Sequence, residues 1–248
     1  MEEDQGKNMA RMQFMNTEID NLTMGETLDA IDKLIAENKN SYVVTPNVDH
    51  IIQLERGGEL KEAYKNADLI LCDGKPLLWI AKWYGTPIKE KISGSDLFPL
   101  LCERAAERGY RMFFLGAGEG VAAKAAENLI GKYKGLKIVG TYSPDKIEKT
   151  IKQASPHILI VALGCPKQEL FILHNRERLG VPISLGLGAS LDFEAGNIKR
   201  APKWMANHGF EWLYRITQDP KRLAKRHLID DRKILSLAIK YKKDSKKC

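Results

Sequence analysis

The stretch RMFFLGAGEGVAAKAAENLIGKY, residues 111–133, contains the two patterns from which the fold can be predicted. Its first five residues form a short apolar run typical of a buried strand, and from Val121 onward apolar residues recur at helical spacing. Glycines at 116, 118 and 120 separate the two segments and indicate a tight turn. A strand that passes through such a turn into a helix is the repeating unit of a parallel sheet covered by helices.

The same alternation continues along most of the chain. Amphipathic helices are predicted at 27–38, 95–109 and 120–133. Almost continuously apolar strands are predicted at 41–45, 68–72, 111–115, 137–140, 157–163 and 182–187. These patterns predict an α/β fold with a mostly parallel sheet of about six strands and helices on both faces. From about residue 203 the pattern is helical only, so we expect a core at 1–202 and a C-terminal helical appendage at 203–248.

The composition is that of a soluble protein, with 44% hydrophobic and 29% charged residues. No run approaches the roughly 20 apolar residues that span a bilayer, and the first residues lack the apolar region of a secretion signal. The four cysteines, at 72, 102, 165 and 248, form no C-x-x-C pair. This spacing favours reduced, structural thiols in a cytoplasmic protein.

Positive charge is concentrated at the C-terminal end. From Lys199 to Lys247 there are 15 Lys and Arg against 5 Asp and Glu, so the rest of the chain carries about −3 of the total charge of +7. A slightly acidic core argues against nucleic acid as a partner. The basic segment predicts contact with phosphate groups, with an anionic membrane surface, or with both.

Polar residues and glycines gather at one predicted edge of the sheet. They follow the predicted strands at Thr45–Asn47, Asp73-Gly74, 116–120, 164–168 and 188–190. Ligands of open parallel sheets bind beyond the carboxyl ends of the strands, where these residues are expected to lie. The sequence therefore predicts a site at this edge.

The glycine turn at Gly116, Gly118 and Gly120 is a candidate phosphate cradle, because backbone N–H groups and a helix N-terminus would face the ligand. A dinucleotide fingerprint would have glycine in place of Val121 and an acid about 20 residues later, and both are missing. A single nucleotide diphosphate fits better. The alternative is a turn that only packs the helix on the strand.

Common sequence motifs of nucleotide-binding, hydrolytic and metal-dependent enzymes are absent from the sequence. There is no G-x-x-x-x-G-K-[ST], G-x-S-x-G, H-E-x-x-H or Asp-x-Asp, and the nearest acidic pair is Asp192-Phe-Glu194. Chemistry without a metal or another cofactor is therefore the expectation. Asp73 either only stabilises a turn or acts as a catalytic base. Asn47 either contacts a bound ligand or caps a helix.

Taken together, these segments resemble the WecG/TagA/CpsF glycosyltransferase family. The resemblance covers nearly the whole chain beyond the first 20 or so residues and implies a Rossmann-like core with a helical appendage. It rests on VVTPNVDH (43–50), ADLILCDGKP (67–76), KISGSDL (91–97), FFLGAGEGVAAKAAENL (113–129), ALGCPKQE (162–169), GLGASLDFEAGNIKRAPKW (186–204) and EWLYRITQDPKRLAKR (211–226).

The resemblance implies an inverting, metal-independent transferase that uses a UDP-sugar. The favoured reaction moves N-acetylmannosamine from UDP-N-acetylmannosamine to N-acetylglucosaminyl-diphospho-undecaprenol, as in teichoic-acid linkage-unit synthesis. The uronic acid form of that donor, or UDP-glucose, is the near alternative. Such an enzyme is expected in the cytoplasm, peripheral on the inner face of the membrane. A non-catalytic nucleotide-sugar sensor is a further alternative, and the sequence leaves open whether the chain forms a homo-oligomer.

The family's site residues map onto numbered positions of this chain. Asp73 takes the place of the catalytic base, Thr45, Asn47 and Gln168 would position the sugars, and Asp192 would lie near the nucleobase. The basic residues of the appendage correspond to Arg215, Arg222 and Lys225, with Arg226 beside them.

Two positions depart from the family pattern. Lys91 stands where an arginine is usual, and it keeps the charge but loses the bidentate fork for a diphosphate. The segment SPD, 143–145, replaces a common Gly-Tyr pair.

For the tail, we expect the aromatic residues of EWLYR, 211–215, to pack on the core. Residues 221–247 contain 11 basic and 3 acidic residues and are expected to contact anionic lipid.

Overall fold

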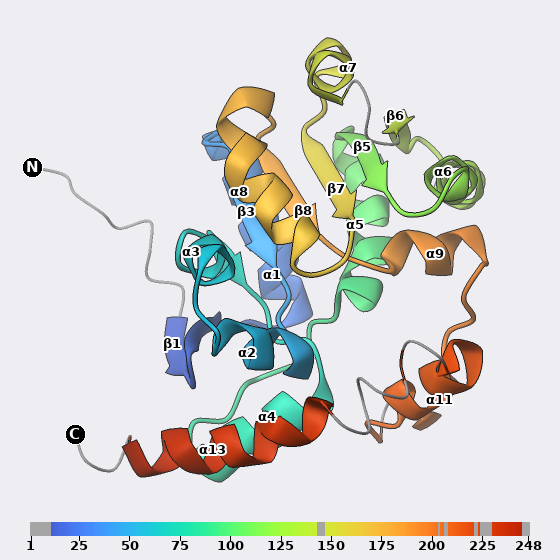
Figure 1. The fold of residues 1–248 in the computed structure, drawn as a ribbon. Coiled ribbons are helices and arrows are strands. Elements are labelled where there is room, and N and C mark those ends of the chain that lie inside the picture. The colour runs from blue at the N-terminus through green and yellow to red at the C-terminus, as the bar shows by residue number, and fades with distance from the viewer. Residues whose placement is uncertain are drawn as a thin grey trace, which may run out of the picture.

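The computed structural model describes residues 11–142, 147–202, 204–205, 208–220, 223 and 230–244. Its centre is a sheet of six strands, all parallel, in the order β4-β3-β8-β7-β5-β6 (Figure 1). The fold class predicted from the sequence is confirmed, and each predicted strand overlaps an observed one. The strands of this sheet are β3 (Ser41–Val44), β4 (Leu69–Ile70), β5 (Arg111–Gly116), β6 (Lys137–Tyr142), β7 (Ile158–Ala162) and β8 (Ile183–Gly186).

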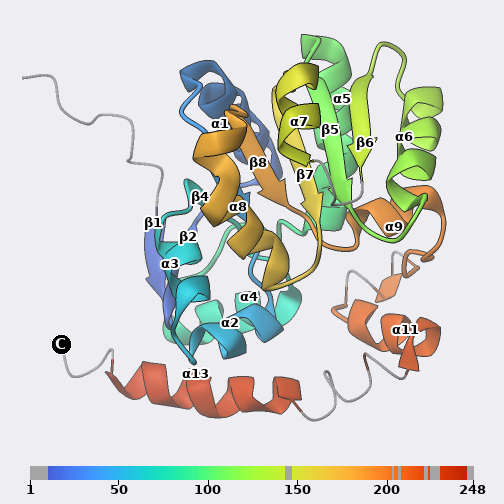
Figure 2. The ribbon, with the colours of Figure 1, turned by 45° about the horizontal axis from the view of Figure 1, so that its top comes forward.

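Helices connect the strands and cover both faces of the sheet (Figure 2). The three amphipathic stretches used for the prediction correspond to α1, α5 and α6. The helices are α1 (Met24–Glu37), α2 (Val48–Leu54), α3 (Glu59–Lys65), α4 (Lys75–Tyr84), α5 (Gly94–Arg108), α6 (Val121–Lys132), α7 (Ile147–Ala154), α8 (Lys167–Leu179), α9 (Ser190–Ala195), α11 (Glu211–Gln218) and α13 (Lys233–Asp244), with a short 3-10 turn, η2 (Asp230–Arg232), before the last.

The alternation of side chains along each strand divides the core in two. On β5, Met112 and Phe114 pack with residues of α1, α5 and α6, whereas Phe113 and Leu115 pack with residues of α2, α4 and α8. All four side chains are fully buried. Because both faces of each strand are covered, the strand sequences are nearly continuous apolar runs, and this is why they could be recognised.

An N-terminal hairpin was not predicted. Strands β1 (Arg11–Phe14) and β2 (Thr17–Asp20) pair antiparallel through a two-residue turn. The turn contains no glycine, and Met15 itself adopts a positive φ of 52°. The buried carboxylate of Asp20 accepts hydrogen bonds from Arg11 and from the backbone N–H of Ile70, which fastens the hairpin to β4.

Helix α13 packs against the core, whereas α11 lies at its surface. Ile234 and Ala238 of α13 are buried, and Tyr84 of α4 donates a hydrogen bond to the Ala238 carbonyl. No residue of α11 is fully buried, but Trp212 and Tyr214 are half-buried, and the expectation that the aromatic residues of 211–215 pack on the core stays a prediction. Among the described residues no helix is long and apolar enough to cross a bilayer. The division at residue 202 stays a prediction.

Candidate active site

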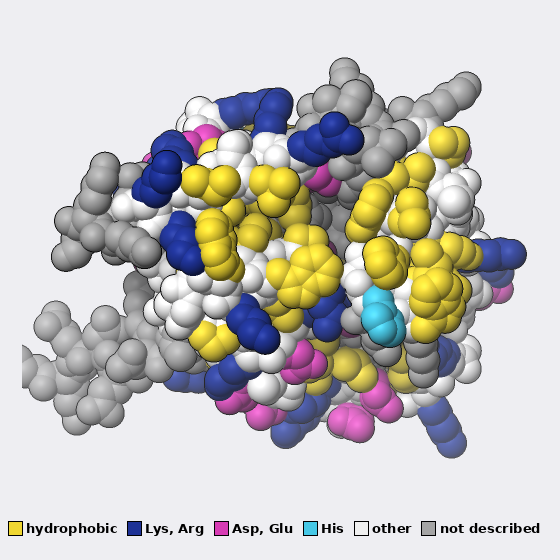
Figure 3. All heavy atoms as spheres, turned by 90° about the horizontal axis from the view of Figure 1, so that it is seen from below, with side chains coloured by type: hydrophobic (Ala, Val, Ile, Leu, Met, Phe, Trp, Pro, Cys, Tyr) yellow, Lys and Arg dark blue, Asp and Glu magenta, His cyan; other side chains and the backbone are white. Residues whose placement is uncertain are grey.

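Two adjoining cavities open at the carboxyl edge of the sheet. Their volumes are about 370 Å³ and about 190 Å³. The larger one lies between α4, α11 and α13, and the smaller one reaches down to the loops that follow β7 and β8. Both are lined by Asn47, Asp49, Asp73, Ser95 and Arg215. In Figure 3 the molecule is hollowed on the face that carries α4, α11 and α13, with hydrophobic side chains on both sides of the hollow.

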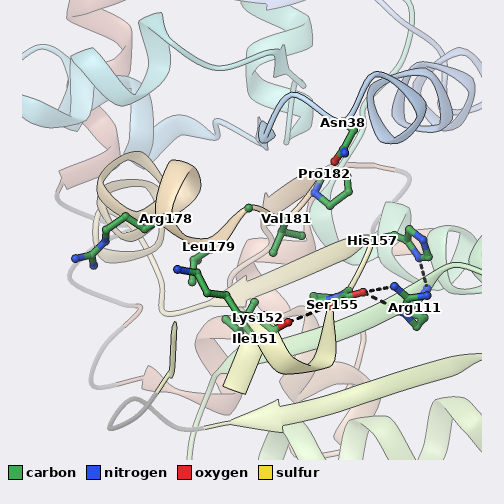
Figure 4. Close-up of a pocket in the computed structure, with 12 residues that line it drawn as sticks. Asn38, Arg111, Ile151, Lys152, Ser155, His157, Arg178, Leu179, Val181 and Pro182 are labelled. Carbon is green, nitrogen blue, oxygen red and sulfur yellow. Dashed lines mark hydrogen bonds between the residues drawn. The ribbon is translucent and has the colours of Figure 1, made fainter. Parts of the chain in front are cut away.

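A third cavity, of about 420 Å³, lies at the opposite, amino edge of the sheet (Figure 4). Its basic side chains already have partners in the protein: Arg111 donates to the Ser155 carbonyl, and Lys152 pairs with Glu148. The imidazole of His157 accepts from the Arg111 backbone N–H. Because ligands of open parallel sheets bind at the carboxyl edge, the two joined cavities are the candidate site.

Asp73 is held by backbone contacts on two sides. Its N–H donates to the carbonyl of Pro46 at 2.9 Å, which extends the pairing of β3 with β4 beyond the strands. The carbonyl of the preceding Cys72 accepts from Ile92 N–H at 2.8 Å. Gly74 then turns the chain into α4 with a φ of +126°, a conformation open to glycine. These contacts fix the backbone of Asp73, a residue that lines both cavities.

The surroundings of Asp73 favour its protonated form. Burial raises the pKa of Asp73 from 3.8 to about 6, and the Glu211 carboxylate adds to the rise. Lys91, His50 and Arg215 act in the other direction, but they do not cancel the effect of burial on this pKa. A carboxylate with a pKa near neutrality can take up a proton and still be ionised when the reaction begins.

Asn47 has two roles in the structure. Its side-chain oxygen caps α2 by accepting from the N–H groups of Asp49 and His50, so the helix-cap interpretation is confirmed. The same side chain also lines both cavities. The imidazole Nδ1 of His50 lies 2.8 Å from the Asn47 oxygen. Thr45, which is buried, lines the smaller cavity beside it.

Gln168 joins two loops at the floor of the smaller cavity. Its side-chain oxygen accepts from Gly164 N–H at 3.2 Å and from Gly188 N–H at 3.0 Å, and these glycines follow β7 and β8. Its amide nitrogen donates to the carboxylate of Glu169 at 2.9 Å. One amide hydrogen is left for a ligand, so Gln168 mainly shapes the cavity.

Lys91 and Arg215 bring positive charge to the larger cavity. The ammonium of Lys91 lies 2.6 Å from an oxygen of Asp96, whose other oxygen accepts from Arg200 at 2.7 Å. Burial alone would lower the pKa of Lys91, but Asp96 outweighs it and the pKa is raised. Lys91 is thus a permanent cation whose charge is already shared with a carboxylate.

The remaining predicted residues fall into two groups. Gly116, Gly118, Gly120 and Asp192 are not among the described residues that line either one. At Gly116 a Cβ atom would come within 2.7 Å of the Ala162 carbonyl oxygen, so close packing already requires glycine there. Their roles in phosphate and nucleobase binding stay predictions. Arg222, Lys225 and Arg226, as well as the segment 143–145, lie outside the described residues.

Several residues at or beneath the site were missed by the sequence analysis. His50 and Glu169 follow Asn47 and Gln168 within the same motifs, so each could have been noticed as a polar residue in the first turn of a helix. Glu211 had no such signal, because its approach to Asp73 depends on the position of α11.

Comparison with known proteins identifies the family. The model of the glycosyl transferase WecG/TagA/CpsF family matches residues 12–248.

The chain belongs to the WecG/TagA/CpsF family of glycosyl transferases.

Two curated relatives of this WecG/TagA/CpsF chain carry the same name, N-acetylglucosaminyldiphosphoundecaprenol N-acetyl-beta-D-mannosaminyltransferase. The protein of Bacillus spizizenii (strain ATCC 23059 / NRRL B-14472 / W23) is 30% identical over 248 residues, which cover 98% of this chain and 94% of the relative. The protein of Bacillus subtilis (strain 168) is 30% identical over 208 residues, which cover 82% and 81%. The prediction of an enzyme that transfers a sugar is confirmed.

Proposed function

We propose that this WecG/TagA/CpsF protein transfers N-acetylmannosamine from UDP-N-acetylmannosamine to N-acetylglucosaminyl-diphospho-undecaprenol. The sugar and the acceptor follow the printed name of two relatives that align with most of this chain. The single observation in the structure that supports the proposal is Asp73, an acid with a pKa raised to about 6 at the wall between two joined cavities. Two cavities suit a reaction that brings a donor and an acceptor together.

In this proposal Asp73 is the general base. It takes the proton of the acceptor hydroxyl while that oxygen forms a bond to the anomeric carbon and the bond from that carbon to UDP breaks. Attack opposite to the leaving group in one step inverts the configuration. A positioned base contributes about 10²–10⁴-fold to such a step. The protonated Asp73 then returns its proton to solvent through the open mouth of the cavity.

The departing diphosphate needs positive charge in its vicinity. Lys91, Arg215 and Arg232 line the larger cavity, where a developing charge would be stabilised by cations that are already in place. Because Asp96 holds Lys91, a diphosphate bound at Lys91 would compete with that carboxylate. Thr45 would contact a sugar in the smaller cavity.

For the location of the enzyme, we propose reversible binding to the inner face of the membrane. The face that carries α4, α11 and α13 exposes large hydrophobic side chains, with Lys and Arg among them (Figure 3). Aromatic side chains with nearby cations suit a lipid interface. One such pair is Lys242, whose ammonium lies 3.9 Å from the ring centroid of Trp83. The exposed residues are Trp79, Trp83, Trp204, Phe210, Leu213, Leu235 and Ile239.

The activity is tested by incubating the purified chain with a panel of UDP-sugars and a short-chain lipid acceptor and following the release of UDP. We expect UDP-N-acetylmannosamine to be the best donor and the rate to be unchanged by EDTA. Asp73→Asn should fold and lose transfer by at least about 10²-fold. Preference for UDP-glucose, or near-normal turnover by Asp73→Asn, would contradict the proposed donor or the proposed base, respectively.

Membrane binding is tested by sedimentation with vesicles that contain phosphatidylglycerol. Ile239→Glu on α13 should weaken binding, whereas Ile130→Glu on α6 should not, although the two side chains are 49% and 48% exposed. Equal effects of the two variants would refute the assignment of this face. A point change is preferable to truncation near Arg215, because truncation would also remove the buried Ile234 and Ala238 from the core.

A further inference from the structure

The floor of the smaller cavity is supported by a buried carboxylate, Glu169 of α8. Its side chain is fully buried, and one carboxylate oxygen accepts from the Gln168 amide at 2.9 Å. The same oxygen lies 3.6 Å from Nε2 of His50. Among the described residues the second oxygen has no hydrogen-bond partner. Burial of a carboxylate with so few partners is costly, by several kcal/mol in typical proteins, so its position calls for an explanation.

Two chains of contacts lead away from Glu169. The first passes through Gln168 to the N–H groups of Gly164 and Gly188 and so reaches the loops after β7 and β8. The second passes through His50 to the side-chain oxygen of Asn47, at 2.8 Å from Nδ1, and so reaches the loop after β3. One carboxylate therefore connects three loops that belong to three adjacent strands of the sheet.

We propose that Glu169 is a positioning residue that holds Asn47, through His50, and Gln168 in the geometry required for sugar transfer. The inference rests on the proposed function, in which a sugar lies in the smaller cavity, and both Asn47 and Gln168 line that cavity. Side chains held in place before the substrate binds lose little entropy in the reaction, and a displacement of about 1 Å can cost about 10²-fold in rate. Glu169 itself does not touch the reacting atoms.

The same region could also be interpreted as a metal site. Ligand atoms of His50, Cys165 and Glu169 lie within 4.8 Å of one another. The positioning role is favoured because one oxygen of Glu169 is already held by Gln168 and Nδ1 of His50 already faces Asn47. Binding of a divalent cation such as Zn²⁺ by these three residues is the alternative that the experiment tests.

The experiment is a double-mutant cycle on kcat/KM for UDP release, with thermal unfolding of every variant. Glu169→Ala should lower kcat/KM by on the order of 10²-fold in the wild-type background. In an Asn47→Ala background, Glu169→Ala should lower kcat/KM by less than about 10-fold, because the contacts that lead from Glu169 to Asn47 are already lost. Glu169→Gln, whose carbonyl can still accept from Gln168, should recover most of the activity.

Asp32→Ala is the matched control. Asp32 lies on α1, away from both cavities, and it too has one carboxylate oxygen without a hydrogen-bond partner among the described residues. Its loss should lower the temperature of unfolding without changing kcat/KM. If Asp32→Ala and Glu169→Ala lower activity equally, or if the effects of Glu169→Ala and Asn47→Ala are additive, the positioning role is refuted.

A replacement variant and a chelator treatment distinguish the positioning role from a folding defect and from a metal site. If Glu169→Ala does not fold, His50→Ala replaces it, and the expected result is a loss of at least about 10-fold that disappears in the Asn47→Ala background. Loss of wild-type activity on treatment with a chelator and its recovery with Zn²⁺ would overturn the proposal in favour of a metal site. Failure of the proposed function would look different, because the wild-type protein would then release no UDP or would prefer a donor other than UDP-N-acetylmannosamine.

Discussion

Asp73→Asn is expected to stabilise the protein while it lowers the rate of transfer by at least about 10²-fold. The folded protein raises the pKa of Asp73 from 3.8 to about 6, mainly through burial, so ionisation of this group at neutral pH opposes folding. A group with a raised folded pKa contributes stability that is complete below about pH 3.8 and is lost as the pH rises through about 6. Asparagine is neutral at every pH and removes this loss.

The size of the effect follows from the shift in pKa. A difference of about two pKa units corresponds to about 3 kcal/mol at pH 7, and to less than about 1 kcal/mol at pH 4, where Asp73 is mostly protonated in the folded protein. For a chain of this length, about 3 kcal/mol raises the temperature of unfolding by roughly 6–12 °C. The gain of Asp73→Asn should therefore be large at neutral pH and small in acid.

The assay is urea unfolding of the wild type and of Asp73→Asn at pH 7 and pH 4, with UDP release measured on the same preparations. Asp29→Asn, at a side chain that is 73% exposed, removes the same charge and should change the free energy of unfolding by less than about 1 kcal/mol. The reasoning is refuted if Asp73→Asn is no more stable than the wild type at pH 7, or if its advantage does not shrink at pH 4.

Three other perturbations test separate parts of the structure. Glu211→Gln removes a carboxylate that raises the pKa of Asp73, so the acidic limb of the pH–rate profile should move to lower pH, and a shift to higher pH would contradict the assignment. Gly116→Ala should lower the free energy of unfolding in urea by about 2–4 kcal/mol, because the new Cβ would meet the Ala162 carbonyl and the residue has a φ of +95°. The kcat of the folded fraction should stay unchanged. A loss of kcat would instead support the phosphate cradle. Glu55→Ala removes the acceptor of two hydrogen bonds from α13, so limited proteolysis should cut near α13 faster than in the wild type, and unchanged cleavage would mean that these bonds do not hold the helix.

The fold could be predicted from the sequence because its elements have local patterns. Strands buried on both faces, such as 111–115 and 157–163, are apolar runs, and the helices between them show one apolar stripe. The hairpin at 11–20 escaped prediction because its strands, RMQF and TEID, mix polar and apolar residues and its turn contains no glycine.

The candidate site was only partly predictable, because its composition depends on the order of the strands. The polar positions at the strand ends could be named from the sequence, Asp73 among them. Strand order decided which of them meet: β3 lies between β4 and β8, so Asn47 and Asp73 face the loops after β7 and β8. The glycine turn follows β5, which lies beyond β7 in the sheet, and it stays outside both cavities.

The sequence by itself determined the α/β class, the strand-end position of Asp73 and the resemblance to a family, since each depends on residues that are close along the chain. Only the tertiary structure decided the pKa of Asp73 and the partners of Glu169. These depend on burial and on groups distant in the sequence, such as Glu211 beside Asp73 and His50 beside Glu169. Electrostatic interactions act through space, and the distances that set them exist only after the chain has folded.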